Sequence, residues 1–244
     1  MDKLLHRRLM AVYNRTRAAH YRAGDDLQVH TDHHRHICEK LSSITASFKR
    51  EISVLDIGCG SGRYFHCIRN ARRLLGIDIS PHMLEQAKNP VFKDQIRIES
   101  IELRCADIFD ARLEPRSFDV AYSIGVLGEY SPLNAAVCSV VYDALTEDGV
   151  FFFTVVDRRS KDSRKGLKRR IAEAAYVFAP AFMRKILDKK LRTFYLTREE
   201  LVAIMDASPF RSSNHIDRYV HNSPYWQGAH FECTAFKRGG KLQD

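Results

Sequence analysis

The strongest constraint on the fold of this chain is the sequence Val54-Leu-Asp-Ile-Gly-Cys-Gly-Ser-Gly62, in which three glycines alternate directly after a short apolar run. Glycines between a strand and a helix adopt backbone conformations that other residues avoid, and they let a ligand lie against the main chain. A helix after such a turn presents free N–H groups and a partial positive charge. The sequence therefore predicts a ligand-binding turn between a strand at 52–57 and a following helix.

Two charged residues beside the glycines narrow the choice of ligand. A dinucleotide-binding turn of the form G-x-G-x-x-G would need a glycine where this chain has Arg63. Asp56 lies two residues before the first glycine, where a carboxylate repels a pyrophosphate but attracts the ammonium group of an amino acid. The pattern favours a ligand with an amino-acid part over a dinucleotide, and over a tight turn that binds nothing.

Two further acids follow the next two predicted strands. Asp78 ends the apolar run 74–78, where a carboxylate can accept hydrogen bonds from both hydroxyls of a ribose. Asp107 is a candidate to bind the exocyclic amine of an adenine, although an Asp in a solvated turn would give the same pattern. Three apolar side chains are candidate walls for the ring: Ile79, Met83 and Ile108.

Short apolar runs alternate with helical patterns along the middle of the chain. The runs lie at 52–57, 74–78, 96–104, 118–123 and 150–156. Between them, Ser80-Pro81 and Ser131-Pro132 are typical of helix starts, because Ser caps a helix and Pro suits its first position. This alternation predicts a parallel sheet with right-handed crossovers. A capping box at Thr197-Arg-Glu-Glu200 predicts a late helix. The runs 212–220 and 229–237 predict a terminal antiparallel hairpin.

The net charge of +9 is concentrated in one segment. Between Asp157 and Arg192 the chain has 13 Lys or Arg and 4 Asp or Glu, and elsewhere the two signs balance. We expect a helical N-terminal cover at 1–50 and an α/β domain at 51–244 that contains a basic lid insertion at about 157–195. The basic run 158–170 fits an anionic, partly apolar small molecule, RNA, an anionic membrane surface, or a solvated helix with no partner. The oligomeric state is not indicated.

Cysteine usage and the chain start indicate a compartment. The six cysteines are scattered and none forms a Cys-x-x-Cys pair, which predicts reduced, mostly buried thiols. The charged stretch Met1–Met10 lacks the apolar core of a secretory signal, and no stretch reaches the roughly 20 apolar residues that cross a bilayer. These features predict a cytoplasmic protein without a transmembrane segment.

From the glycine loop onward, the sequence resembles the class I S-adenosylmethionine-dependent methyltransferases, in their small-molecule branch. The loop matches that family's D-x-G-x-G-x-G sequence, and 75–84, 118–123 and 145–150 resemble its second strand, its fourth strand and the turn before its fifth. The resemblance implies a doubly wound, Rossmann-like α/β sheet of seven mostly parallel strands with an antiparallel last strand. It also implies S-adenosyl-L-methionine as cofactor and methyl transfer to an O, N or S nucleophile of a small molecule.

The same resemblance assigns residues to parts of the cofactor. The implied contacts are Asp56, Gly58, Cys59 and Gly60 for the methionine part, Asp78 for the ribose, Asp107, Ile79, Met83 and Ile108 for the adenine, and Ser123 for the floor near the sulfonium. N-terminal helices often cover the cofactor in this family, which makes Tyr13 and Tyr21 further candidates.

The sequence says less about the molecule that accepts the methyl group. The chain lacks the Asn/Asp-Pro-Pro-Tyr sequence after its fourth strand, which argues against adenine-N6 and glutamine acceptors. Alignment and desolvation supply most of the catalysis, and a hydroxyl acceptor also needs a base. The catalytic candidates are Glu129, His20 and Tyr21, although Glu129 also fits a solvated loop.

The remaining histidines leave several interpretations open. In the cluster His30, His33, His34 and His36, the pair His33 and His36 can share a helical face and bind a metal, but without a cysteine pair the sequence favours a polar helix face and no metal site. His221 and His230, on either side of Tyr225-Trp226, are pocket candidates. An RNA methyltransferase that uses the basic segment and a non-catalytic S-adenosylmethionine-binding partner protein remain alternatives.

Overall fold

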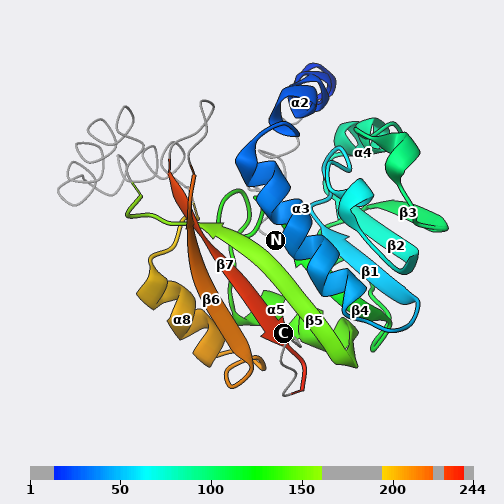
Figure 1. Cartoon of the computed structure of the whole chain (residues 1–244). Coiled ribbons are helices and arrows are strands. Elements are labelled where there is room, and N and C mark those ends of the chain that lie inside the picture. Colours follow the sequence, from blue (N-terminus) through cyan, green and yellow to red (C-terminus); the bar gives the residue numbers. More distant parts are fainter. Residues whose placement is uncertain (1–13, 161–193, 222–227, 239–244) are drawn as a thin grey trace.

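The computed structural model describes residues 14–160, 194–221 and 228–238, and its centre is a seven-stranded sheet (Figure 1). The strands follow the order β3-β2-β1-β4-β5-β7-β6. Their bounds are β1 Ile52–Ile57, β2 Ala71–Asp78, β3 Ser100–Cys105, β4 Phe118–Ser123, β5 Leu145–Val156, β6 Asn214–Val220 and β7 Ala229–Phe236. β1 to β5 pair in parallel, and β7 runs antiparallel to both β5 and β6. The expected α/β sheet with its terminal hairpin is confirmed.

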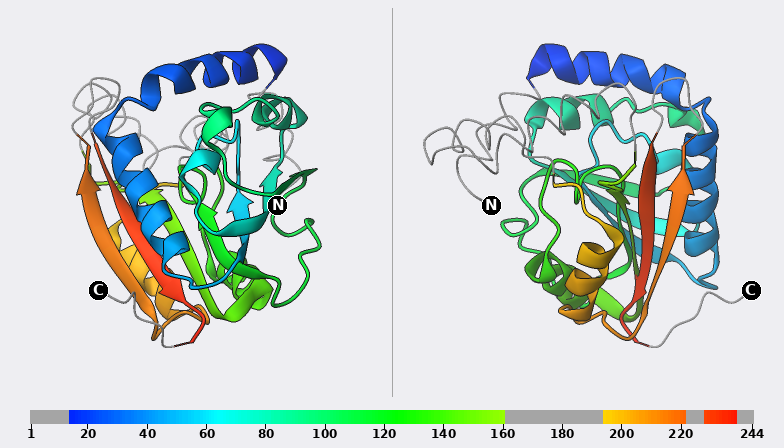
Figure 2. Two further views of the ribbon diagram at one scale, coloured as in Figure 1. Left: turned by 45° about the vertical axis from the view of Figure 1, so that its right-hand side comes forward. Right: turned by 90° about the vertical axis from the view of Figure 1, so that its left-hand side faces the viewer.

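Helices cover both faces of the sheet, which explains why its central strands β1, β4 and β5 are buried on both sides (Figure 1, Figure 2). α3 (Asp32–Ala46) packs on one face, and α5 (Ala135–Ala144) and α8 (Arg198–Asp206) pack on the other. Because strand side chains alternate, Val54 joins the buried cluster under α3, whereas Leu55 joins the cluster under α5 and α8.

The helix starts follow the predicted caps in two cases out of three. Ser80 caps α4 (Pro81–Ala87), and the capping box of Thr197 with Glu200 opens α8. The predicted start of α5 at Ser131-Pro132 is wrong, because the carbonyl of Ser131 accepts from Gly128 N–H at 2.7 Å and closes a turn instead. α5 begins three residues later, with Asn134 as its cap.

The predicted α-helix after the glycine loop is also wrong. The segment contains only the 3-10 helix η1 (Phe65–Cys67). Gly62 has a φ of +75°, and a residue in the left-handed region cannot continue a right-handed helix. Strand limits differ too. β3 begins at Ser100, four residues later than expected, and the expected turn at 145–150 belongs to β5, where the pairing with β4 shifts register between Phe118 and Val120.

Several predictions fall outside the described residues: those for Tyr13, for the apolar stripe at 4–13, for Tyr225-Trp226, and for most of the basic insertion. The ends of that insertion are described. Asp157 and Leu196 form a bridge, and Arg158 forms an ion pair with Glu200 at 2.8 Å, so the chain leaves and returns at one place. Among the described helices, none is long and apolar enough to span a membrane.

The prediction of six reduced thiols is wrong for two of them in this structure. Cys38 of α3 and Cys67 of η1 form a disulfide, whereas Cys59, Cys105, Cys138 and Cys233 are free. The pairing joins segments 29 residues apart, a proximity that the scattered spacing does not reveal.

Candidate functional site

The glycine loop follows β1 at the carboxyl edge of the sheet, next to the boundary between β1 and β4. Strand order reverses there, and open α/β sheets bind ligands at such switch points. Gly58 has a φ of +77°, and a Cβ at this position would lie 2.5 Å from a methyl carbon of Val126. Only glycine fits, so bare backbone forms this wall of the site.

Hydrogen bonds that the loop donates to the end of β2 hold the loop in place. The N–H groups of Gly58 and Cys59 donate to the Ile77 carbonyl at 2.8 and 3.0 Å. Gly60 N–H donates to Asp78 Oδ2 at 3.0 Å, and the other oxygen of Asp78 accepts a backbone N–H two residues on, at 2.8 Å. Each carboxylate oxygen retains a second lone pair, so Asp78 can still accept hydrogen bonds from a ligand.

The cavity beside this loop, called here the loop cavity, brings most of the predicted cofactor contacts together. Ten of them line it: Tyr21, Asp56, Gly58, Cys59, Gly60, Asp78, Ile79, Met83, Asp107 and Ile108. Ser123 does not line it, because this side chain is fully buried and its hydroxyl donates to the Ile57 carbonyl at 2.9 Å.

Asp56 is a buried acid in the wall of the loop cavity. Burial raises the pKa of its carboxyl to about 8, with the neighbouring Tyr122 hydroxyl opposing the shift and the charge of Asp78 adding to it. Among the described residues, Asp56 forms no ion pair. It therefore suits a ligand that brings a cation, such as the ammonium group of an amino acid.

α2 (Arg15–Gln28) is fastened to the segment after the glycine loop by Arg63. The Nε atom of Arg63 donates to Asp25 Oδ1 at 2.5 Å and its Nη1 atom donates to Gln28 Oε1 at 2.7 Å. Asp25 is fully buried and also accepts a hydrogen bond from the Ser61 hydroxyl. The guanidinium lies over the Tyr21 ring, 5.1 Å from its centroid. This brace positions Tyr21 at the loop cavity.

A second cavity, called here the histidine cavity, adjoins the first. Six residues line both: Tyr21, Arg63, Tyr64, Ile124, Gly125 and Tyr130. Its own wall adds His33, His221, His230 and the predicted Glu129. Burial raises the pKa of Glu129 to about 7, with a hydrogen bond from Tyr130 opposing the shift. His20 is exposed and lines neither cavity.

The histidines of this cavity continue into a buried chain of hydrogen bonds. His221 Nε2 lies 2.5 Å from His230 Nδ1, and His230 Nε2 lies 2.9 Å from Glu232 Oε1. Although burial opposes it, the hydrogen bonds and charges of His230 and His36 lower the pKa of Glu232. Burial, and next the neighbouring His230, lowers the pKa of His221 to about 3. The hydrogen-bonded series thus runs from the neutral imidazole of His221 through His230 to the ionised carboxylate of Glu232.

Three residues of the site were missed from the sequence. Arg63 entered only as the residue that excludes a dinucleotide, and Tyr64 gave no signal, yet both line the two cavities. Glu232 alternates with His230 on β7, so the two side chains share one face, which was the available signal.

Comparisons with known proteins agree with this geometry. A family model described as a methyltransferase domain matches residues 48–198. A malonyl-[acyl-carrier protein] O-methyltransferase of Acetivibrio thermocellus is 28% identical over 117 residues, which is 47% of this chain but only 39% of that protein.

Solved structures share the fold at low identity. A possible histamine N-methyltransferase of Thermotoga maritima has a TM-score of 0.53 and 17% identity, over 83% of this chain and 92% of that one. Magnesium protoporphyrin IX methyltransferase of Synechocystis, with bound S-adenosylhomocysteine, has a TM-score of 0.59 and 13% identity, over 95% and 99% of the two chains.

Proposed function

The chain belongs to the methyltransferase domain family, and we propose that it methylates an O, N or S nucleophile of a small molecule held in the histidine cavity. Its methyl donor is S-adenosylmethionine. The loop cavity fits that group on two counts: glycine backbone lines its wall at Gly58, Cys59 and Gly60, and the buried carboxyl of Asp56 is suited to bind a cation. Asp78 would bind the ribose, and Asp107 with Ile108 the adenine.

The observation that carries the proposal is the wall that the two cavities share. Tyr21, Arg63 and Tyr130 face both spaces, so a donor in one and an acceptor in the other would meet at this wall. When bound, S-adenosylmethionine supplies a methyl group on a positively charged sulfur, which the acceptor attacks directly. The protein's part is to align the acceptor and exclude water.

The histidine chain supplies a destination for the acceptor's proton. His230 lines the cavity, and the carboxylate of Glu232 stabilises the imidazolium that forms when His230 accepts a proton. His221, whose pKa is lowered to about 3, stays neutral and holds His230 in place by a hydrogen bond. Glu129 lies in the same wall and orients an acceptor amine or hydroxyl. The name of the Acetivibrio relative supports an oxygen acceptor, and the guanidinium of Arg63 favours one that carries negative charge.

The proposal is tested by supplying the full chain with S-adenosylmethionine labelled in its methyl group, together with host-cell extract. The extract is then separated into organic-soluble, water-soluble small-molecule, RNA and protein fractions. We expect label in a small-molecule fraction. With S-adenosylmethionine well below saturation, Asp78→Ala should lower the label strongly, because the variant loses charged hydrogen bonds to the ribose worth about 1.5–3 kcal/mol, a 10- to 150-fold loss of affinity.

Other distributions of label would contradict the proposal. Label in RNA would assign the basic run 158–170 to nucleic-acid binding, and affinity for RNA should then fall steeply with salt. Tight cofactor binding with no label in any fraction would indicate a non-catalytic partner protein.

A further inference from the structure

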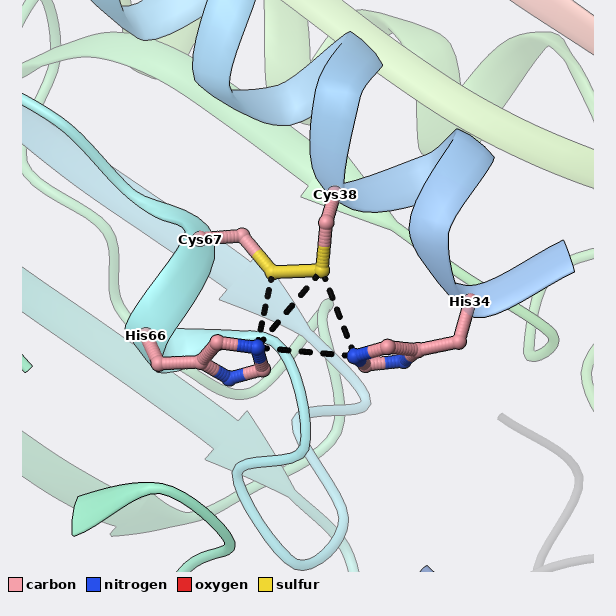
Figure 3. A group of neighbouring side chains, drawn as sticks. All are labelled: His34, Cys38, His66 and Cys67. Carbon is pink, nitrogen blue, oxygen red and sulfur yellow. Dashed lines mark hydrogen bonds between the residues drawn. A yellow bond between two sulfur atoms is a disulfide. The ribbon is translucent and has the colours of Figure 1, made fainter. Parts of the chain in front are cut away.

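Four side chains that are suited to metal binding converge between α3 and the segment after the glycine loop: His34, Cys38, His66 and Cys67 (Figure 3). His34 and Cys38 lie one turn apart on α3 and therefore share a face of that helix. His66 and Cys67 are neighbours in η1. The two sulfur atoms and one nitrogen of each ring all lie within 4.8 Å of one another.

The disulfide between the two cysteines does not explain where the imidazoles lie. A disulfide sulfur carries neither a proton nor a negative charge, so it offers an imidazole nitrogen little to bind. Yet His34 Nε2 lies 3.3 Å from Cys38 Sγ, and His66 Nε2 lies 3.7 Å from Cys38 Sγ and 3.4 Å from Cys67 Sγ. Figure 3 shows both rings directing Nε2 toward the sulfurs and toward each other, and those nitrogens are 3.5 Å apart.

We propose that, with Cys38 and Cys67 reduced, these four residues bind one Zn²⁺ ion. Two thiolates and two imidazoles are a common structural zinc set, and the two thiolates neutralise the ion in a largely buried place. Zn–S bonds of about 2.3 Å and Zn–N bonds of about 2.0–2.1 Å place tetrahedral ligand atoms roughly 3.3–3.8 Å apart. The nitrogen–nitrogen separation and three of the four nitrogen–sulfur separations already match this range, so the main change needed is that the two sulfurs move apart.

The ion would hold in place a segment that lacks the expected α-helix. In the place of the expected α-helix, the segment 61–67 has one turn of 3-10 helix, and its packing partner is α3. Arg63 and Tyr64, which line both cavities, lie within three residues of His66. A closed four-ligand site leaves no position for substrate, so the ion fastens the cofactor loop to α3 and takes no part in chemistry.

The test is the metal content of the full chain, purified with a thiol reductant and without a histidine tag, then measured by elemental analysis. We expect one zinc per chain. The double variant Cys38→Ser/Cys67→Ser and the variant His34→Ala should lose it, whereas Cys105→Ser and His215→Ala, which alter exposed residues elsewhere, should retain it. Chelation should lower the melting temperature and weaken S-adenosylhomocysteine binding several-fold.

A spectrum keeps the test decisive even where a variant fails to fold. Cobalt exchanged into the wild-type protein should show the visible absorption of a tetrahedral site and a sulfur-to-metal charge-transfer band. A second histidine group, His33, His221 and His230, has suitable geometry but contains no sulfur. Cobalt without the charge-transfer band, zinc that is lost only from His230→Ala, or a metal-free protein with an intact disulfide under reductant would each overturn the proposal.

Discussion

The two cavities share a wall but are assembled in different ways. The loop cavity takes its three acidic residues from the ends of three successive strands, β1, β2 and β3: Asp56, Asp78 and Asp107. The histidine cavity gathers His33 from α3, Glu129 from the segment after β4, and His230 from β7. One of its supporting hydrogen bonds, from His36 to Glu232, joins residues 196 positions apart. A local sequence pattern can therefore reveal the first cavity, whereas only the folded chain forms the second.

The two cavities also differ in electrostatics. Burial leaves the loop cavity with a carboxyl of raised pKa, Asp56, which is suited to a cationic ligand. The histidine cavity also contains a buried carboxyl, Glu129, but adds His230 in contact with the ionised Glu232, a pair that is suited to accepting a proton. This contrast predicts that substitutions in one cavity change cofactor affinity and that substitutions in the other change turnover.

The largest expected effect is on turnover, from His230→Ala. Removal of a group that accepts the acceptor's proton should lower kcat by about 10²–10⁴-fold, while the Kd for S-adenosylhomocysteine stays within about twofold. Glu232→Gln should lower kcat in the same direction, because the imidazolium loses its carboxylate. Turnover is measured on the acceptor fraction that labelling identifies, with the exposed His215→Ala as control. Equal losses of turnover and of cofactor affinity would remove the distinction between the cavities.

A pair of glycine substitutions tests the loop cavity with a smaller effect. Gly58→Ala places a Cβ 2.5 Å from Val126 at a positive φ, which costs about 1–3 kcal/mol and should weaken S-adenosylhomocysteine binding by roughly ten- to hundredfold. Gly24→Ala, in α2, meets open space, so it should leave binding unchanged and stabilise the helix by up to about 1 kcal/mol. Calorimetric titration and thermal unfolding separate the two results. Unchanged affinity in Gly58→Ala would show that the loop backbone does not contact the cofactor.

The part of the fold that sequence could predict is the part that local rules govern. Strand alternation and the Ser80 and Thr197 caps act within a few residues, and the structure has these features where the patterns indicated. The helix expected after Gly62 failed for one local and one tertiary reason. Glycine permits the positive φ at which the segment turns but does not require it, and the packing of the segment on α3 is not encoded locally.

In the candidate site, too, sequence could predict the features that local rules set and missed those that depend on tertiary packing. Ten predicted cofactor contacts share a cavity because parallel strands bring their carboxyl ends to one edge. Glu129 reached the second cavity, but the exposed His20 did not, since position on the predicted N-terminal cover does not reveal which way a helix faces. The Cys38–Cys67 pair was missed for a related reason: its partners meet only when α3 packs on η1.

The last effect is a pH dependence of cofactor binding that arises in the loop cavity and needs no substitution. Without ligand, Asp56 has a pKa of about 8, and an ammonium group binds its ionised form. Binding of S-adenosylhomocysteine should therefore release a proton near pH 7 and strengthen by up to about tenfold per unit between pH 6 and 8, then level off. Calorimetry in buffers of different ionisation enthalpy measures the released proton. Asp56→Asn cannot ionise, so its binding should be weak and nearly flat over this range. A flat profile in the wild type would mean that the ligand's cation does not bind Asp56. The electrostatic difference between the cavities would then depend on the histidines alone.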